Sequence, residues 1–190
     1  MTQRKFWMRW RVRAGYPVGL AYWVLASPTR HSILYGAIIA AFGLIVRGAA
    51  SGHLYKDRQL ATTGPYACTR NPLYLGSAFL AAGFIVAGHS WIAGLLVAVY
   101  FGAFYYAVMK NEEADLRARF GVTFEDYARR VPLFFPRAPR KRPPSSANIA
   151  HSDAKFSWAQ YMRNREYKAL IGVIAGMGFL FLRIWIGSRG

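Results

Sequence analysis

The chain has 190 residues, 54% of them hydrophobic and 16% aromatic, and its formal net charge is +17 because 25 Lys and Arg face only 8 Asp and Glu. This composition excludes a disordered chain, and it disfavours a nucleic-acid partner because such a basic domain would rarely carry long uncharged runs. The single cysteine, Cys68, excludes an intramolecular disulfide and a cysteine-based metal site.

Uncharged or nearly uncharged segments predict an all-α polytopic membrane helix bundle with about five transmembrane helices, at about 20 residues for each crossing. These segments are Ala14–Ala26, Ser32–Val46, Pro72–Ala87, Trp91–Met109 and Ala169–Gly187. Ala14–Ala26 is short, so we expect a tilted span. Gly88-His89-Ser90 divides the longest uncharged run into a helical hairpin. Arg183 lies close enough to the end of the last span for its side chain to reach the headgroups.

Basic residues gather before Ala14, between Ser51 and Asn71, and between Lys110 and Lys168. The positive-inside rule then predicts a cytoplasmic N-terminus and a C-terminus on the opposite side. We expect an integral membrane protein of a bacterial inner membrane, without a cleaved signal peptide. Anionic membrane lipids explain the excess positive charge better than a nucleic acid does.

The sequence predicts three parts: residues 1–136 as a membrane core, residues 137–154 as a basic connector rich in Pro and Ser, and residues 155–190. In the last part, the aromatic residues of Lys155–Lys168 favour an interfacial helix before the final span. Gly172 and Gly176 in that span have the spacing of close helix packing.

Acidic residues are few, and several follow the hairpin directly: Glu112, Glu113, Asp115, Glu125 and Asp126. One explanation is a helix start capped by Asn111, because acids suit the first turn of a helix. The loop before the hairpin offers complementary groups, with a turn at Gly64-Pro65 and then Arg70. Pro72 fits the first turn of a helix, which places Arg70 and Tyr74 near the glutamates at the mouth of the hairpin.

Two segments of the sequence resemble a known family. They are GPYACTRNPLYLG and NEEADLRARFGVTFEDYARRVPLFFP, and an apolar stretch separates them. They resemble the membrane methyltransferases grouped around isoprenylcysteine carboxyl methyltransferase and phosphatidylethanolamine N-methyltransferase. Those enzymes share an Arg-His/Asn-Pro-x-Tyr-x-Gly element, a hydrophobic hairpin and a Glu-Glu pair. The elements occur here in the same order between Gly64 and Pro136, which makes the resemblance fairly specific.

The resemblance implies S-adenosylmethionine as methyl donor, held in a cytoplasmic pocket between the motif loop and a helical cap. Arg70 would pair with the donor's carboxylate, while Glu112 and Glu113 would accept from its ammonium or ribose hydroxyls. Aromatic faces of Tyr66 and Tyr74 would contact adenine or the sulfonium. Tyr127 would close the pocket, although Leu116, Phe120 and Phe124 already predict an amphipathic helix there. The implied cofactor-binding residues are Gly64, Tyr66, Arg70, Asn71, Pro72, Leu73, Tyr74, Glu112, Glu113 and Tyr127, and the implied catalytic residues are Arg70, Tyr74, Glu112 and Glu113.

The acceptor stays open between a lipid-like or prenylated carboxylate, which needs no base, and a phospholipid amine, which needs a glutamate to remove a proton. Asn71 stands where the isoprenylcysteine enzymes most often carry His, so the substrate cannot be carried over directly. A sterol-type reductase on a related scaffold and a non-catalytic basic membrane protein are the alternatives. No metal site is expected, because the histidines show no ligand spacing: they are His31, His53, His89 and His151.

Overall fold

The computed structural model describes residues 3–55, 59–139 and 155–187, and these residues form helices and loops without any strand. The elements in chain order are α1 (Gln3–Leu25), α2 (Arg30–Gly52), the short 3-10 helix η1 (Gly64–Ala67), α3 (Pro72–Gly88), α4 (Trp91–Arg130), α5 (Trp158–Arg163) and α6 (Tyr167–Gly187). The all-α class is therefore confirmed. Most of the predicted connector, residues 140–154, lies outside the described residues.

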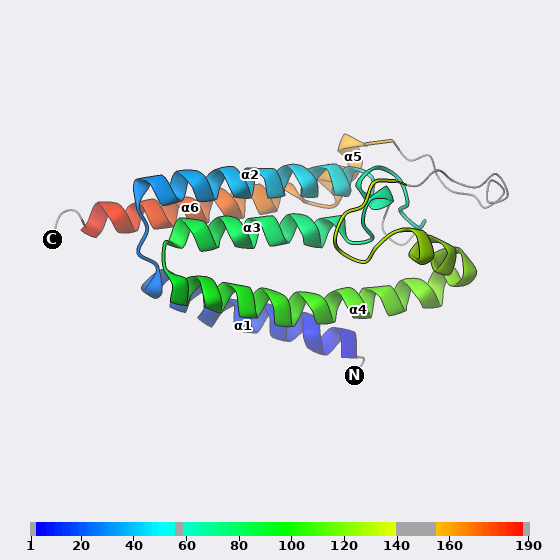
Figure 1. Cartoon of the computed structure of the whole chain (residues 1–190), viewed down its shortest axis with the longest axis horizontal. Coiled ribbons are helices and arrows are strands. Elements are labelled where there is room, and N and C mark those ends of the chain that lie inside the picture. Colours follow the sequence, from blue (N-terminus) through cyan, green and yellow to red (C-terminus); the bar gives the residue numbers. More distant parts are fainter. Residues whose placement is uncertain (1–2, 56–58, 140–154, 188–190) are drawn as a thin grey trace.

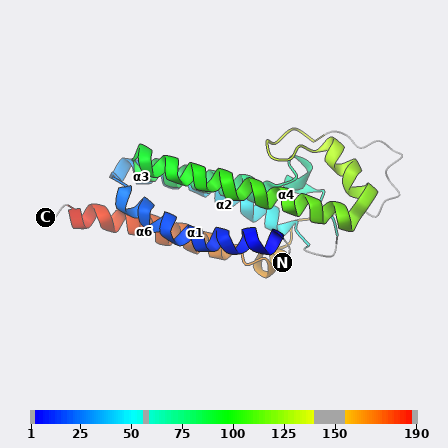
Figure 2. The ribbon, with the colours of Figure 1, turned by 90° about the horizontal axis from the view of Figure 1, so that it is seen from below.

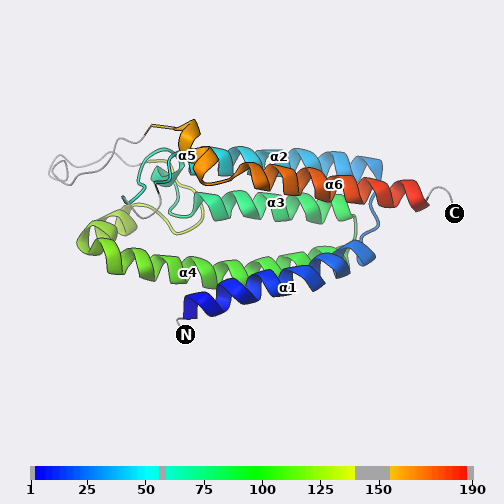
Figure 3. The same ribbon diagram turned by 180° about the vertical axis from the view of Figure 1, so that it is seen from behind.

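The long helices alternate in direction along one elongated bundle (Figure 1). Helices α2, α3 and α6 pack together, while α1 packs along α4 (Figures 1 and 3). η1, α5 and the end of α4 lie at one end of the bundle, which we call the motif end. The predicted turn at His89 and Ser90 joins α3 to α4 at the opposite end, as expected.

Within the described residues, three helices are long and apolar enough to cross a membrane: α2, α4 and α6. α3 is apolar but has only 17 residues. Large apolar side chains on the outside of the bundle, such as Ile45, Val99 and Ile174, are more than half exposed. Such a surface suits lipid rather than water, so the chain is a membrane protein. The spans expected at Ala14–Ala26 and Pro72–Ala87 stay predictions.

Glycines bring the backbones of α2 and α3 into direct contact. A Cβ atom on Gly36 would lie 2.4 Å from the carbonyl oxygen of Gly83, and one on Gly43 would lie 2.7 Å from that of Gly76. Only glycine permits this approach at both crossing points. Gly172 and Gly176 of α6 were expected to pack closely against another helix. Among the described residues, only Gly176 of the two has a close neighbour, the ring of Phe84.

At the far end, Arg183 of α6 holds the end of α1. Its guanidinium donates hydrogen bonds of 2.5 Å to the carbonyl of Trp23 and 2.9 Å to that of Val24. The last carbonyl groups of a helix have no hydrogen-bond partner within the helix. They can therefore accept hydrogen bonds from the Arg183 guanidinium inside the protein. Arg183 therefore binds the end of α1, and its expected place near the headgroups stays a prediction.

α4 does not stop at the expected boundary. It continues through Met109 and Asn111 without a new start, and the Asn111 amide donates to the carbonyl of Ala107 at 2.9 Å. The proposed helix start at Asn111 was therefore wrong. The backbone instead departs from helical geometry at Gly121, with φ 49° and ψ −123°, and the chain folds back toward the motif end (Figures 1 and 2).

The segment before α6 caps α2 rather than forming one long interfacial helix. α5 has only six residues, and Arg165 adopts a left-handed φ of 56° after it. The Asn164 amide donates to the carbonyls of Ser51 at 2.9 Å and Leu54 at 3.0 Å, at the end of α2. The predicted extent of a helix over Lys155–Lys168 was wrong, because this turn satisfies the open carbonyls of α2.

The fold-back at Gly121 predicts a strong asymmetry between two exposed glycines of α4. No atom of the described residues lies within 4 Å of a Cβ on Gly121 or on Gly102, so backbone geometry is what distinguishes them. We expect Gly121→Ala to lower the free energy of unfolding in mixed micelles by about 1–3 kcal/mol through backbone strain. Gly102→Ala, in regular helix, should leave it unchanged or raise it by up to about 1 kcal/mol. Equal effects of the two substitutions would contradict this account of the fold-back.

Candidate functional site

The motif loop, which we define as residues 59–71, is bound to the segment that follows α4. The backbone N–H of Arg70 donates to the Pro132 carbonyl at 2.9 Å, and that of Arg137 donates to the Cys68 carbonyl at 3.0 Å. The Thr69 hydroxyl donates to the Phe134 carbonyl at 2.9 Å. The two segments that carry the sequence resemblance are thus one structural unit.

Asn71 takes part in the same contact. Its side-chain amide donates to the Leu133 carbonyl at 3.0 Å, while its own carbonyl accepts from the backbone N–H of Tyr74 and Leu75. Pro72 occupies the first turn of α3, as predicted. Asn71 therefore joins the loop, the start of α3 and the segment after α4 through a neutral donor that does not titrate.

A buried ion pair connects the motif loop to α4. Arg70 Nη1 lies 2.5 Å from Glu113 Oε1, and the two side chains are only 14% and 10% exposed. Lys110 Nζ lies 3.4 Å from the other oxygen of Glu113. The Nε atom of Arg70 is buried and has no hydrogen-bond partner among the described residues. A buried guanidinium donor in this state needs an acceptor, so this atom marks a place where a polar ligand group would be stabilised.

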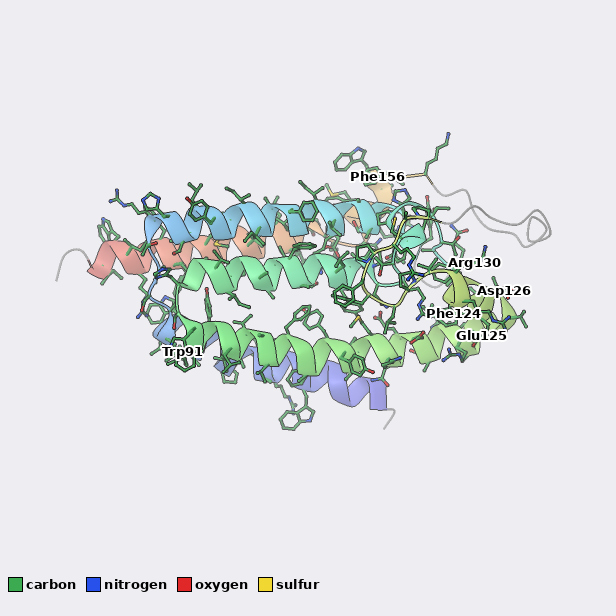
Figure 4. All side chains as sticks on the ribbon, in the orientation of Figure 1. Trp91, Phe124, Glu125, Asp126, Arg130 and Phe156 are labelled. Carbon is green, nitrogen blue, oxygen red and sulfur yellow. The ribbon has the colours of Figure 1, made fainter. Side chains whose placement is uncertain are left out.

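An apolar cluster shields the ion pair on the side of the fold-back. The buried residues of the cluster are Leu60, Phe124, Tyr127 and Val131, and Leu116, Phe120 and Ala128 pack against them. The expected amphipathic pattern is therefore confirmed. The Arg70 guanidinium carbon lies 6.0 Å from the centre of the Phe124 ring. Figure 4 shows Phe124 on the returning part of α4, at the opposite end of the bundle from Trp91.

Tyr66 and Tyr127 form a buried contact within this cap. The Tyr127 hydroxyl donates to the Tyr66 carbonyl at 2.7 Å. Burial raises the pKa of both side chains well above the ordinary value of a tyrosine. Neighbouring groups raise the pKa of Tyr66 further: they are Tyr127, Glu112, Glu166 and Tyr74. Both hydroxyls are therefore protonated at neutral pH, and the charge of Glu112 acts on Tyr66.

Aromatic rings extend from the start of α3 to α4. The ring of Tyr74 meets that of Tyr105 edge-on at 5.6 Å, and Tyr105 stacks on Phe101 at 4.1 Å. Gly64 begins η1 with a left-handed φ of 58°, and the His53 ring lies against it. The backbone carbonyl of Leu73 accepts from Arg47 of α2 at 3.3 Å. All the predicted site residues thus lie at the motif end.

The structure brings some predicted residues into direct contact and adds others. Arg70 meets Glu113, and Tyr127 meets Tyr66, while Glu112 is linked to Tyr66 through its charge. The sequence reasoning missed Arg47 and Glu166. The available signals were an arginine inside an apolar helix and an acid immediately before the last helix, since such charges are rarely left unpaired. Among the residues that the structure describes, no three His, Cys, Asp or Glu side chains gather as metal ligands.

The chain resembles known proteins over part of its length. Residues 36–123 match the phospholipid methyltransferase family. A nickel-cobalt-cadmium resistance protein of Alcaligenes xylosoxydans xylosoxydans is 39% identical over 82 residues, which are 43% of this chain and 38% of that protein. Methanethiol S-methyltransferase 2 of Bradyrhizobium diazoefficiens is 36% identical over 121 residues, 60% of this chain and 42% of that protein.

A eukaryotic relative extends the resemblance. Protein-S-isoprenylcysteine O-methyltransferase of Schizosaccharomyces pombe is 28% identical over 109 residues, 55% of this chain and 46% of that protein. The chain thus spans less than half the length of these three relatives. No solved structure matches it. The resemblance to the isoprenylcysteine and phospholipid methyltransferases, drawn above from the motifs, is confirmed.

The buried tyrosine contact predicts a specific loss of stability and a specific pH dependence. Tyr127→Phe should cost about 1–3 kcal/mol, because the buried Tyr66 carbonyl loses its donor. Since both tyrosine pKa values are raised in the folded state, their contribution is constant up to about pH 10 and is lost above it, where unfolded tyrosines ionise.

Thermal unfolding in detergent between pH 7 and about pH 11 measures both effects. The midpoint should fall above about pH 10, and less steeply in Tyr127→Phe than in the unchanged chain. Tyr106→Phe is the matched control, because this tyrosine of α4 is 58% exposed. A midpoint that Tyr127→Phe leaves unchanged would refute the structural role of the contact.

Proposed function

We propose that this chain, which matches the phospholipid methyltransferase family over residues 36–123, is an S-adenosylmethionine-dependent methyltransferase. The reaction would take place at the cytoplasmic face of a membrane, on a lipid-like acceptor. The observation that carries the proposal is the Arg70–Glu113 pair, which joins the motif loop to α4. In the part of the chain that the structure describes, this pairing leaves the buried Arg70 Nε without a partner.

The residues at the motif end fit the chemical groups of this donor. Arg70 Nε would bind the donor's carboxylate, because a guanidinium–carboxylate contact is a strong, charge-assisted one. Glu112, whose neighbour Glu113 is already paired with Arg70 and Lys110, would accept from an ammonium or a ribose hydroxyl. Tyr74 at the start of α3 would present its aromatic face to adenine or to the positive sulfur. Gly64, Asn71, Pro72 and Leu73 would shape the loop around these groups.

The donor would supply a methyl group on a positively charged sulfur, for direct displacement by the acceptor. The task of the protein is then to align the reacting groups and to exclude water. Phe124 and Tyr127 keep water from the Arg70–Glu113 pair, since both are at most 4% exposed. Tyr66 and Tyr127, protonated at neutral pH, would add no negative charge there.

The charges favour a carboxylate acceptor over an amine. Glu113 is already engaged by Arg70 and Lys110, so it is poorly available as a proton acceptor. An ionised carboxylate needs no base, whereas an amine would depend on Glu112. The name of the Schizosaccharomyces pombe relative describes methylation of isoprenylcysteine, a cysteine with an apolar chain. We therefore propose carboxyl O-methylation of a prenylated or similarly lipidated acceptor.

Binding of S-adenosylhomocysteine to detergent-purified protein, measured by calorimetry, tests the donor site. We expect micromolar affinity, and we expect Glu112→Gln to weaken it by about tenfold through the loss of a charge-assisted contact. Glu125→Gln is the control, because Glu125 belongs to the same helix but pairs with Arg117 beyond the site. Absence of binding by a folded sample would refute the proposed function.

Transfer of a labelled methyl group distinguishes the acceptors. We expect label to enter a prenylated cysteine with a free carboxylate, and to be released by mild alkali because a methyl ester hydrolyses there. Label incorporated instead into phosphatidylethanolamine vesicles, stable to alkali, would assign the protein to N-methylation. The same prenylated cysteine with its carboxylate amidated is the control and should accept no label.

A further inference from the structure

A second, partly buried ion pair lies outside the predicted site residues. Arg47 of α2 binds Glu166, which precedes α6, through two parallel hydrogen bonds of 3.0 Å, from Nε to Oε2 and from Nη2 to Oε1. The two side chains are 20% and 10% exposed. A guanidinium held at two points has a fixed plane, so its remaining nitrogen has a fixed direction.

The remaining nitrogen, Arg47 Nη1, binds the start of α3, which carries the end of the RNPLYLG motif. Arg47 Nη1 donates to the carbonyl of Leu73 at 3.3 Å and to the hydroxyl of Ser77 at 2.5 Å, both in the first turns of α3. The Ser77 hydroxyl also donates to the Leu73 carbonyl at 2.9 Å. Gly76 makes room for the arginine, because a Cβ there would lie 2.5 Å from Arg47 Cγ. The glycine that ends the RNPLYLG motif thus admits the stem of Arg47.

Glu166 is itself held in place by the turn between α5 and α6. Asn164 binds the carbonyls at the end of α2, and the Glu166 backbone N–H donates to the Tyr161 carbonyl at 3.4 Å. The charge of Glu166 also reaches Tyr66, one of the neighbours that raise the pKa of that tyrosine. Residue 166 lies beyond the segment 36–123 that matches the family.

We infer that Glu166 is a positioning residue of the donor site. Through Arg47 it holds the start of α3, and the hydrogen bonds from Tyr74 and Leu75 to the Asn71 carbonyl pass this restraint to the loop that carries Arg70. Glu166 lies after the basic connector, whereas all the sequence motifs of the site lie before it. The segment after the connector therefore contributes a contact that the site needs. The identity of the ligand in this inference rests on the proposed function, whereas the contacts of Glu166 and Arg47 do not.

Two measurements on the 190-residue chain test the inference. One is the affinity for S-adenosylhomocysteine. The other is the rate at which a maleimide labels Cys68, the only cysteine and part of the motif loop, since this rate rises when the loop opens. Arg183→Ala is the matched control for Glu166→Ala, because Arg183 also ties α6 to another helix, at the far end.

We expect Glu166→Ala to weaken ligand binding and to speed the labelling of Cys68, each by about tenfold, because the lost contact is partly buried, bidentate and charge-assisted. Glu166→Gln, which keeps an acceptor for Arg47, should restore part of both effects. Arg183→Ala should lower the thermal midpoint but leave affinity and labelling within about twofold, because its contacts lie far from the loop.

The outcomes separate this inference from the proposed function. Unchanged labelling in folded Glu166→Ala, or an equal change in Arg183→Ala, would overturn the positioning role. If the unchanged chain binds no S-adenosylhomocysteine, the proposed donor site fails, and the labelling rates alone decide whether Glu166 holds the loop. Faster labelling in Glu166→Ala but not in Arg183→Ala would then still support the inference.

Discussion

The buried pair of Arg70 and Glu113 is the interaction on which the motif end depends. Each charge would be costly inside the protein alone, and each comes from a different part of the chain, the motif loop and α4. The hairpin of α3 and α4 places its turn at the far end, and the cap that contains Phe124 and Tyr127 packs beside the pair. The pair adds little net stability, but it penalises every arrangement that separates its members.

The position of α3 is fixed from two sides. Its glycines lie directly on the backbone of α2, which leaves little freedom for sliding or rotation. At the motif end, Arg47 reaches from α2 to the first turns of α3 and is neutralised by Glu166. Close backbone packing thus sets the distance between the helices, and a directed guanidinium sets the orientation of the turn that carries the motif.

The sequence predicted the local features of this fold and missed its long-range partners. Uncharged runs located the helices, Pro72 marked the start of α3, and the spacing of Leu116, Phe120 and Phe124 predicted a packed face. The fold-back at Gly121 was missed, because a glycine inside an amphipathic pattern has no distinct signal. The contact of Tyr127 with a backbone carbonyl and that of Glu166 with Arg47 depend on tertiary packing, which a single sequence does not reveal.

This chain has few acidic residues, so the position of each one is informative. With 25 basic residues and 8 acidic ones, most cations must be neutralised by water, ions or lipid headgroups. A buried guanidinium has none of these, so it needs a carboxylate from the chain itself. Glu113 serves Arg70 and Glu166 serves Arg47, and both pairs hold the same motif from opposite sides. In a strongly basic membrane protein, shielded acids such as Glu113 and Glu166 therefore indicate where the fold holds a guanidinium in one place, and here both indicate the loop proposed to bind the methyl donor.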